Sequence, residues 1–168
     1  MKKVFRIIII FIINNFLSFT RFFKIKKIML KFIGIDVGYN TKIVGPIYLG
    51  NKINVKIGEN CWIGKNIQFD GDGEVIIGNN VDIAPNVVIN TGGHKISSIN
   101  RRAGEGVVNR IFIEDGVWIG TRSTIINNIK VGYGSVIAAG SVVIKDINKN
   151  VLVAGNPAVI KRKLEELI

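Results

Sequence analysis

The sequence contains one cysteine, Cys61, and one histidine, His94, among its 168 residues. A single cysteine excludes an intrachain disulfide framework and fits a reducing compartment, so we expect a cytoplasmic protein. One histidine and one cysteine cannot form, within one chain, the tetrahedral nitrogen and sulfur site that zinc prefers. We therefore predict a protein without a metal centre.

Acidic residues are absent from the first 31 positions, which carry eight lysines and arginines. These eight account for most of the net charge of +11, so the rest of the chain is nearly balanced and a nucleic-acid partner is not predicted. At helical spacing Arg6 and Asn14 lie near one stripe, with Phe5 and Ile9 opposite. Residues 1–34 are therefore predicted to form a basic amphipathic helix or helix pair.

Two interpretations of this segment remain open. Its uncharged run, residues 7–20, has 14 residues, fewer than the ~18–20 that span a bilayer. No small-residue cleavage site follows it, which argues against a signal peptide. Its basic and apolar character favours peripheral contact of residues 1–31 with anionic lipid at the inner face of the cell membrane. Alternatively, the segment covers the open end of the repeat domain that follows.

Proline is also scarce, with three residues against 19 glycines, which suits many stacked turns better than a helical bundle. Residues 113–148 divide into six consecutive six-residue units, each beginning with an aliphatic side chain. Self-similarity of this kind is typical of a solenoid. Three units would make a coil of 18 residues whose aliphatic positions stack on those of the next coil. We therefore predict an all-β solenoid, a parallel β-helix over residues 35–155.

The repeat is irregular before residue 113. The steps from Leu49 to Ile57 and from Phe69 to Ile77 are each two residues too long. Residues 90–112 lack the pattern, and we predict that they form a polar loop that projects from one corner. His94 follows two glycines at the base of this loop. A lone histidine there can act as a general base at neutral pH, and we favour this role over that of an exposed histidine without function.

The segments INTGGH, IEDGVWIG, VIAAGSVVIKDI and VLVAGNPA together resemble the hexapeptide-repeat sugar O-acetyltransferases, such as the galactoside, maltose and colanic-acid acetyltransferases. The resemblance covers residues 57–163. It implies a left-handed β-helix, a homotrimer, acetyl-CoA as acyl donor and a sugar or glycan as acceptor. The leading prediction is thus transfer of acetyl to a sugar hydroxyl in the synthesis of a surface polysaccharide, such as a capsule, an O-antigen or an exopolysaccharide.

The resemblance also assigns roles to single residues. His94 falls on the family's general base, and Glu105 matches a loop acid that could orient the imidazole or simply be solvated. The pantetheine arm would lie between subunits against the backbone amides of Thr121 and Ala139, and the Thr121 amide could also stabilise the oxyanion. The remaining predicted contacts with acetyl-CoA come from a tryptophan beside the site and from basic residues near the nucleotide phosphates: Trp118, Lys145, Lys161 and Arg162.

One departure from the family concerns the tail, residues 156–168, where Val159 stands in place of a basic residue after the Pro-Ala pair. We expect Pro157 to end the last coil and a short helix to begin at Ile160. Alternatives to the leading function are a serine or amino-sugar N-acetyltransferase and a structural β-helix without activity. The first two classes usually carry a further domain, and the third would not need the histidine.

Overall fold

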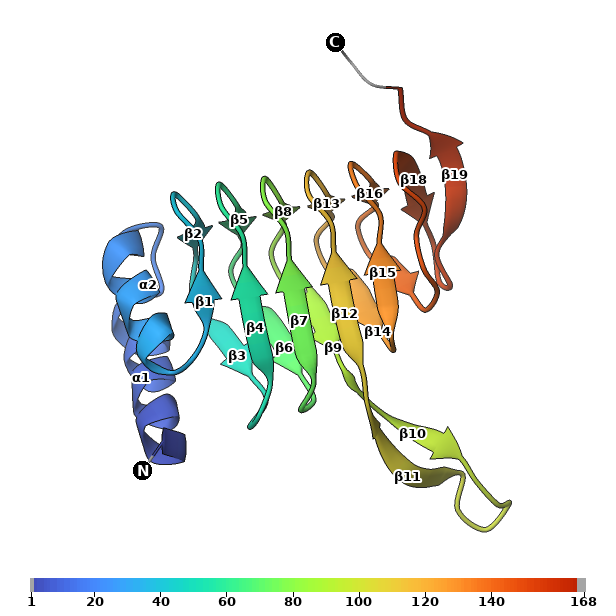
Figure 1. Cartoon of the computed structure of the whole chain (residues 1–168), viewed down its shortest axis with the longest axis horizontal. Coiled ribbons are helices and arrows are strands. Elements are labelled where there is room, and N and C mark those ends of the chain that lie inside the picture. Colours follow the sequence, from blue (N-terminus) through green and yellow to red (C-terminus); the bar gives the residue numbers. More distant parts are fainter. Residues whose placement is uncertain (1, 166–168) are drawn as a thin grey trace.

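The protein, described here from a computed structural model over residues 2–165, is a left-handed parallel β-helix with two helices at its N-terminal end (Figure 1). The solenoid has three sheets, one on each side of its coils. The first sheet contains β1 (Asp36–Val37), β4 (Asn54–Ile57), β7 (Glu74–Ile77), β12 (Arg110–Ile113) and β15 (Ile129–Val131). The second contains β2 (Lys42–Ile43), β5 (Trp62–Ile63), β8 (Asp82–Ile83), β13 (Trp118–Ile119), β16 (Val136–Ile137), β18 (Val151–Ala154) and β19 (Val159–Lys163). The third contains β3 (Ile47–Leu49), β6 (Ile67–Asp70), β9 (Val88–Asn90), β14 (Thr124–Ile126) and β17 (Val142–Val143).

The six-residue period produces the core directly. Successive aliphatic residues that open the hexads pair in parallel register, as Ile57 does with Ile77 and Ile119 with Ile137. Each column is buried against the column of the next sheet, and Ile63, Ile83 and Ile119 have no exposed surface. Buried stacks of this kind supply most of the favourable free energy of a repeat fold, because no coil can bury its aliphatic face alone.

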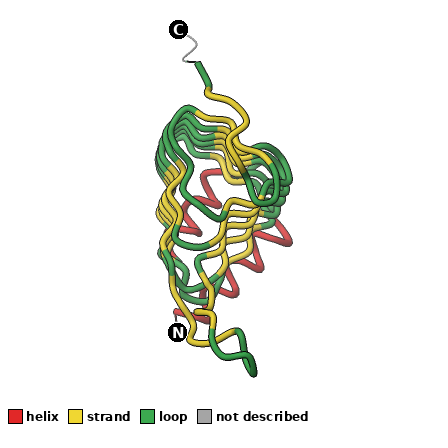
Figure 2. The backbone as a smooth tube through the Cα atoms, turned by 90° about the vertical axis from the view of Figure 1, so that its right-hand side faces the viewer, coloured by secondary structure: helices red, strands yellow, loops and turns green. Residues whose placement is uncertain are grey.

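The two steps that are two residues too long fall at the same corner of the solenoid, between the third and the first sheet. Ile57 follows Val37 by 20 residues and Ile77 follows Ile57 by 20, whereas Val131 follows Ile113 by 18. In the third coil, a hairpin made of β10 (Gly92–Ile96) and β11 (Ala103–Val108) projects from this corner. Figure 2, which looks along the stacked coils, shows the hairpin leaving the body at this one corner. The polar excursion predicted for residues 90–112 is therefore an ordered antiparallel hairpin on a widened corner.

The N-terminal helices, α1 (Lys2–Phe16) and α2 (Phe23–Phe32), cover the open end of the first coil (Figure 1). Ile9, Ile13 and Leu30 are buried in the same apolar cluster as the first coil. Polar side chains also turn inward, contrary to the predicted polar stripe: Asn14 Nδ2 donates to the Ile47 carbonyl at 2.9 Å, and the Ile47 N–H donates to Asn14 Oδ1 at 2.8 Å. These contacts satisfy backbone groups that an uncovered strand edge would leave unpaired.

The predicted helix from Ile160 is wrong. Residues 159–163 form β19, which pairs antiparallel with β18, Val151 opposite Lys163 and Leu152 opposite Arg162. β18 is the last parallel strand of its sheet and would otherwise expose a row of N–H and C=O groups, so pairing with β19 covers this edge. Leu164 and Glu165 are not helical either, and residues 166–168 of the predicted helix lie outside the described part of the chain.

Candidate active site

The hairpin that carries His94 is fixed to the solenoid by Thr91, which is fully buried. Thr91 Oγ1 donates to the Asp70 carbonyl at 3.0 Å and accepts from the Gly73 N–H at 3.0 Å. Its carbonyl accepts from the Asn109 N–H at 2.8 Å, where the second hairpin strand returns to the body. Both strands of the hairpin are thus tied to the corner of the coil beneath, and His94 lies three residues beyond this anchor.

An ion-pair cluster supports the return of the hairpin into β12. The carboxylate of Glu74 contacts Arg110 Nε at 2.9 Å and Lys56 Nζ at 3.0 Å. The hydrogen bond from Lys56, together with the two positive charges, lowers the pKa of Glu74 below its ordinary value. The carboxylate therefore stays ionised over the neutral range and holds Arg110, the first residue of β12.

The imidazole of His94 is oriented by the opposite strand of the hairpin. His94 Nδ1 lies 2.9 Å from the carbonyl oxygen of Gly104. A carbonyl oxygen only accepts hydrogen bonds, so Nδ1 carries a proton, and in the neutral imidazole Nε2 then presents its lone pair. His94 is exposed, and the residue opposite it in the hairpin is Gly106, which has no side chain to cover the ring. The arrangement leaves Nε2 free to accept a proton from a bound hydroxyl.

Glu105 lies away from His94. Side chains alternate between the two faces of a strand, and Glu105 is the neighbour of Gly106, the residue paired with His94. Its Oε2 contacts Lys95 Nζ at 2.6 Å instead. Lys95 and the Gly104 carbonyl were not singled out from the sequence. The alternation of side chains between the two faces of a hairpin could have identified them, but it can be applied only once the register of the two strands is known.

The two predicted amide donors lie one above the other, as their separation of 18 residues requires. The strands before them, β13 and β16, pair in parallel with Ile119 opposite Ile137. Thr121 Oγ1 donates to the Pro85 carbonyl at 2.6 Å, and the Thr121 carbonyl accepts from the Gly140 N–H at 2.8 Å. Within residues 2–165, neither the Thr121 N–H nor the Ala139 N–H has an intrachain acceptor.

The other predicted contacts lie in the C-terminal half of the solenoid, from β13 onward. Trp118 in β13 is 56% exposed and stands three residues before Thr121. Lys145 follows β17 at the corner of the hairpin, two coils further along, and Lys161 and Arg162 lie on the exposed strand β19. A single chain does not bring the Thr121 and Ala139 amides together with His94. The hairpin leaves between the third and first sheets, whereas Thr121 lies between the second and third.

Cys61 offers no competing nucleophile. The thiol is buried, and burial raises its pKa, which keeps it protonated. Its Sγ lies 3.2 Å from the Gly78 carbonyl and so packs within the wall of the solenoid. In the described part of the chain, no group of three or more histidine, cysteine or carboxylate residues is placed to hold a metal ion.

Comparison with known proteins agrees with this architecture. The family described as the hexapeptide repeat of succinyl-transferase matches residues 54–91 and 110–145, leaving out the hairpin. The galactoside O-acetyltransferase of Escherichia coli is 36% identical over 141 residues, which cover 84% of this chain and 70% of that protein. That of Lactococcus lactis is 35% identical over 140 residues, covering 82% and 67%. The chain spans 65% to 70% of the length of three similar acetyltransferases.

Solved structures give the same result. A galactoside acetyltransferase in complex with coenzyme A is 30% identical and superimposes with a TM-score of 0.83, covering 98% of this chain and 82% of that one. The protein therefore belongs to the hexapeptide-repeat acetyltransferases, and galactoside O-acetyltransferases are among the relatives that it resembles in sequence.

Proposed function

We propose that the protein transfers acetyl from acetyl-CoA to a hydroxyl of a sugar or glycan, with His94 as the general base. The observation that carries this proposal is the free Nε2 of a single histidine whose Nδ1–H is held by Gly104 at 2.9 Å. Galactoside O-acetyltransferases among its relatives and a relative solved with coenzyme A support the choice of donor and acceptor class.

In the proposed reaction His94 Nε2 accepts the proton of the acceptor hydroxyl while the hydroxyl oxygen attacks the thioester carbonyl carbon. A backbone N–H, that of Thr121 or Ala139, donates to the oxyanion that forms. The tetrahedral intermediate then expels the CoA sulfur, which takes the proton from His94. The products are the acetyl ester and free CoA, and the histidine returns to its starting state.

We propose further that the working site lies between two subunits of a homotrimer. His94 and the free amides of Thr121 and Ala139 occupy different corners of one chain, so a second copy would have to supply the missing half of each site. The exposed aromatic side chain of Trp118, beside these amides, supports an intersubunit role because large exposed aromatic residues are enriched at interfaces. In this arrangement Lys145, Lys161 and Arg162 are proposed to meet the nucleotide phosphates.

The acceptor is proposed to be a glycan of a surface polysaccharide, and the enzyme to work in the cytoplasm at the inner face of the cell membrane. This location would concentrate enzyme and a lipid-linked glycan in one thin layer. The acceptor is tested with a panel of free sugars, nucleotide sugars and lipid-linked glycans. Serine and amino sugars belong in the same panel, because preferred transfer to an amine would replace the proposed O-acetyl transfer.

The general base is tested with His94→Asn, measured by release of the CoA thiol. The asparagine amide can replace Nδ1 as donor to Gly104 but provides no base, so hairpin geometry is kept while proton transfer is lost. We expect turnover to fall about 100- to 10,000-fold, with the KM for acetyl-CoA unchanged. Turnover near that of the wild type would refute the role of His94.

The shared site is tested by mixing subunits. Thr121→Pro removes one proposed amide donor, and it places proline in register with Pro85 of the preceding coil, where Ile83 pairs with Ile119. Trimers of His94→Asn alone and of Thr121→Pro alone should both be impaired. Trimers refolded from a mixture should regain activity, because some sites then combine an intact histidine with an intact amide. Absence of recovery in mixed trimers would place the whole site within one chain.

A further inference from the structure

The two N-terminal helices, here called the cap, have an apolar outer surface as well as an apolar inner one. Eleven of the 23 large apolar side chains that are exposed in the described residues lie between positions 4 and 32. A helix that merely covers a solenoid end should present polar residues to water on its outer side. Contiguous exposed apolar patches of this kind mark interaction surfaces.

Helical spacing separates the outer side from the inner one. On α1 the buried residues Ile9 and Ile13 face the first coil, and Ile8 and Phe11 point away from it. On α2 the buried residue Leu30 faces the coil, and the opposite side exposes further apolar residues. We define the outer cap face by six exposed side chains: Val4, Ile8, Phe11, Ile25, Ile28 and Phe32.

The charge around this face is of one sign. Arg21, Lys24 and Lys31 are exposed beside it, and the first acidic residue of the chain is Asp36. A symmetric contact between two copies of this face would bring like charges together. An anionic lipid surface instead complements both the cations and the apolar side chains, which is the composition of helices that lie in a membrane interface.

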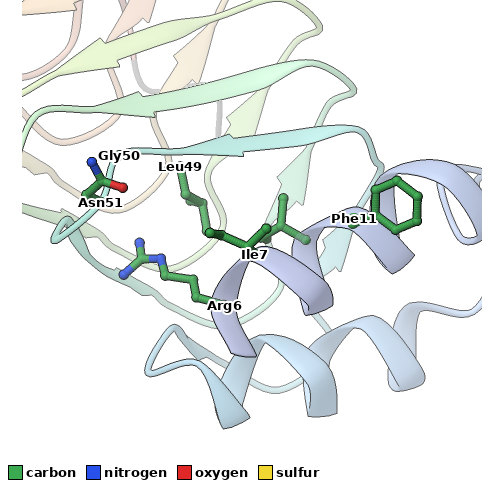
Figure 3. A pocket seen from close by; sticks show the side chains of 7 residues that line it. Arg6, Ile7, Phe11, Leu49, Gly50 and Asn51 are labelled. Carbon is green, nitrogen blue, oxygen red and sulfur yellow. The ribbon is translucent and has the colours of Figure 1, made fainter. Parts of the chain in front are cut away.

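Two hollows extend the face at the edges of the cap. One of about 270 Å³ is lined by Arg6, Ile7, Phe11 and Leu49, among others, and Figure 3 shows Arg6 extending toward the turn after β3 while Phe11 lies further along α1. The other, of about 710 Å³, lies beside α2 and combines Phe22 and Phe23 with three lysines, Lys24, Lys27 and Lys42. Aromatic rings beside ammonium groups are suited to the boundary between lipid headgroups and acyl chains.

The length of the helices decides how they can meet the bilayer. No helix in the described part of the chain is long and apolar enough to cross a membrane. The 15 residues of α1 extend about 22 Å, whereas the hydrocarbon core is about 30 Å thick. The inner sides of both helices are moreover engaged with the first coil, so only their outer sides are available.

We propose that the outer cap face is a docking surface for anionic membrane lipid, on which the cap lies flat with its apolar side chains inserted and its cations at the headgroups. This surface gives the proposed membrane localisation a physical basis and does not depend on the proposed reaction. The cap thus has two functions at once: its inner side covers the first coil and its outer side binds lipid.

Co-sedimentation of the full-length protein with vesicles tests the surface. Vesicles of phosphatidylcholine with phosphatidylserine should bind the protein, those of phosphatidylcholine alone should bind it less, and salt should weaken binding. The charge variant Arg21→Gln/Lys24→Gln/Lys31→Gln should lose about fivefold in affinity for each cation removed. Its matched control, Lys65→Gln/Arg101→Gln/Lys149→Gln, removes three exposed cations elsewhere and should bind as the wild type does.

The apolar contribution is tested with Ile8→Gln/Phe11→Gln/Ile28→Gln, which should reduce binding by about tenfold or more. The control Ile96→Gln/Ile99→Gln changes two apolar residues near the end of the hairpin that are even more exposed, and it should leave binding unchanged. Circular dichroism and thermal unfolding establish that both variants keep the fold.

Each remaining outcome decides against the proposal. Full-length protein that stays in the supernatant at low and high salt excludes lipid docking. If the charge variant weakens binding but the apolar variant binds as the wild type does, insertion of the apolar face is excluded. If vesicles fail to bind and the apolar variant instead dissociates an oligomer in sedimentation velocity, the face is a contact between copies. Acetyl transfer to a soluble sugar, measured on the same variants, reports separately on the proposed reaction.

Discussion

Lys26, on the inner side of α2, is a cation with no exposed surface. Its Nζ donates to the Phe19 carbonyl at 2.9 Å and lies 4.8 Å from the centre of the Phe23 ring. The described structure gives the ammonium no carboxylate partner, and burial lowers the pKa of Lys26 from 10.5 to about 8. We predict that Lys26→Met changes the dependence of stability on pH.

The sign follows from proton binding in the two states. Below pH 8 the lysine is charged in both the folded and the unfolded chain, and burial of the charge destabilises the fold. Between pH 8 and 10.5 the folded protein has released a proton that the unfolded chain still holds, so the free energy of unfolding rises with pH. The difference between the two pKa values corresponds to about 3 kcal/mol. Above pH 10.5 both forms are neutral and the difference stays constant.

Urea unfolding of the wild type and of Lys26→Met across this pH range measures the effect. Protein concentration must be held fixed, because the stability of an oligomer depends on it. Other titrating groups are common to both proteins and cancel in the difference. The wild type should gain about 3 kcal/mol relative to the variant as the pH rises from 8 to 10.5. The exposed neighbour provides the control, since Lys24→Met should give a curve parallel to the wild type. Parallel curves for Lys26→Met as well would refute the assignment of a buried charge.

Two further predictions concern the coils and the hairpin. A Cβ on Gly132 would lie 2.5 Å from the backbone nitrogen of Lys149 in the next coil, so Gly132→Ala should cost about 1–3 kcal/mol in urea unfolding. Gly106→Ala, with nothing within 4 Å, should cost far less, and equal losses would contradict the close stacking of the coils. Glu105→Gln should leave the pH profile of turnover unchanged, because Glu105 contacts Lys95 and not His94. A displaced profile would show that Glu105 reaches the imidazole in the active complex.

Much of the fold was readable from the sequence because its determinants are local and repeated. An aliphatic residue every sixth position predicts both the stacked columns and the length of a coil, and Ile113, Ile119 and Ile125 occupy three such columns. The steps ending at Ile57 and Ile77 showed where the coils widen, and the loss of the pattern after Ile89 showed where the hairpin leaves. The prominence of His94 likewise needed only a count of histidines and the glycines before it.

Tertiary structure decided which groups meet, because pairing depends on the register of strands and on what covers an open edge. The register of the hairpin separates Glu105 from His94 and gives the imidazole the Gly104 carbonyl. Residues 159–163 form a strand because they pair with the otherwise open edge of β18, although their charge and spacing also suit a helix. The same requirement turns Asn14 toward the first coil, which leaves the outer side of the cap apolar. Such long-range contacts satisfy backbone groups that no local pattern identifies, and for that reason only the folded chain reveals them.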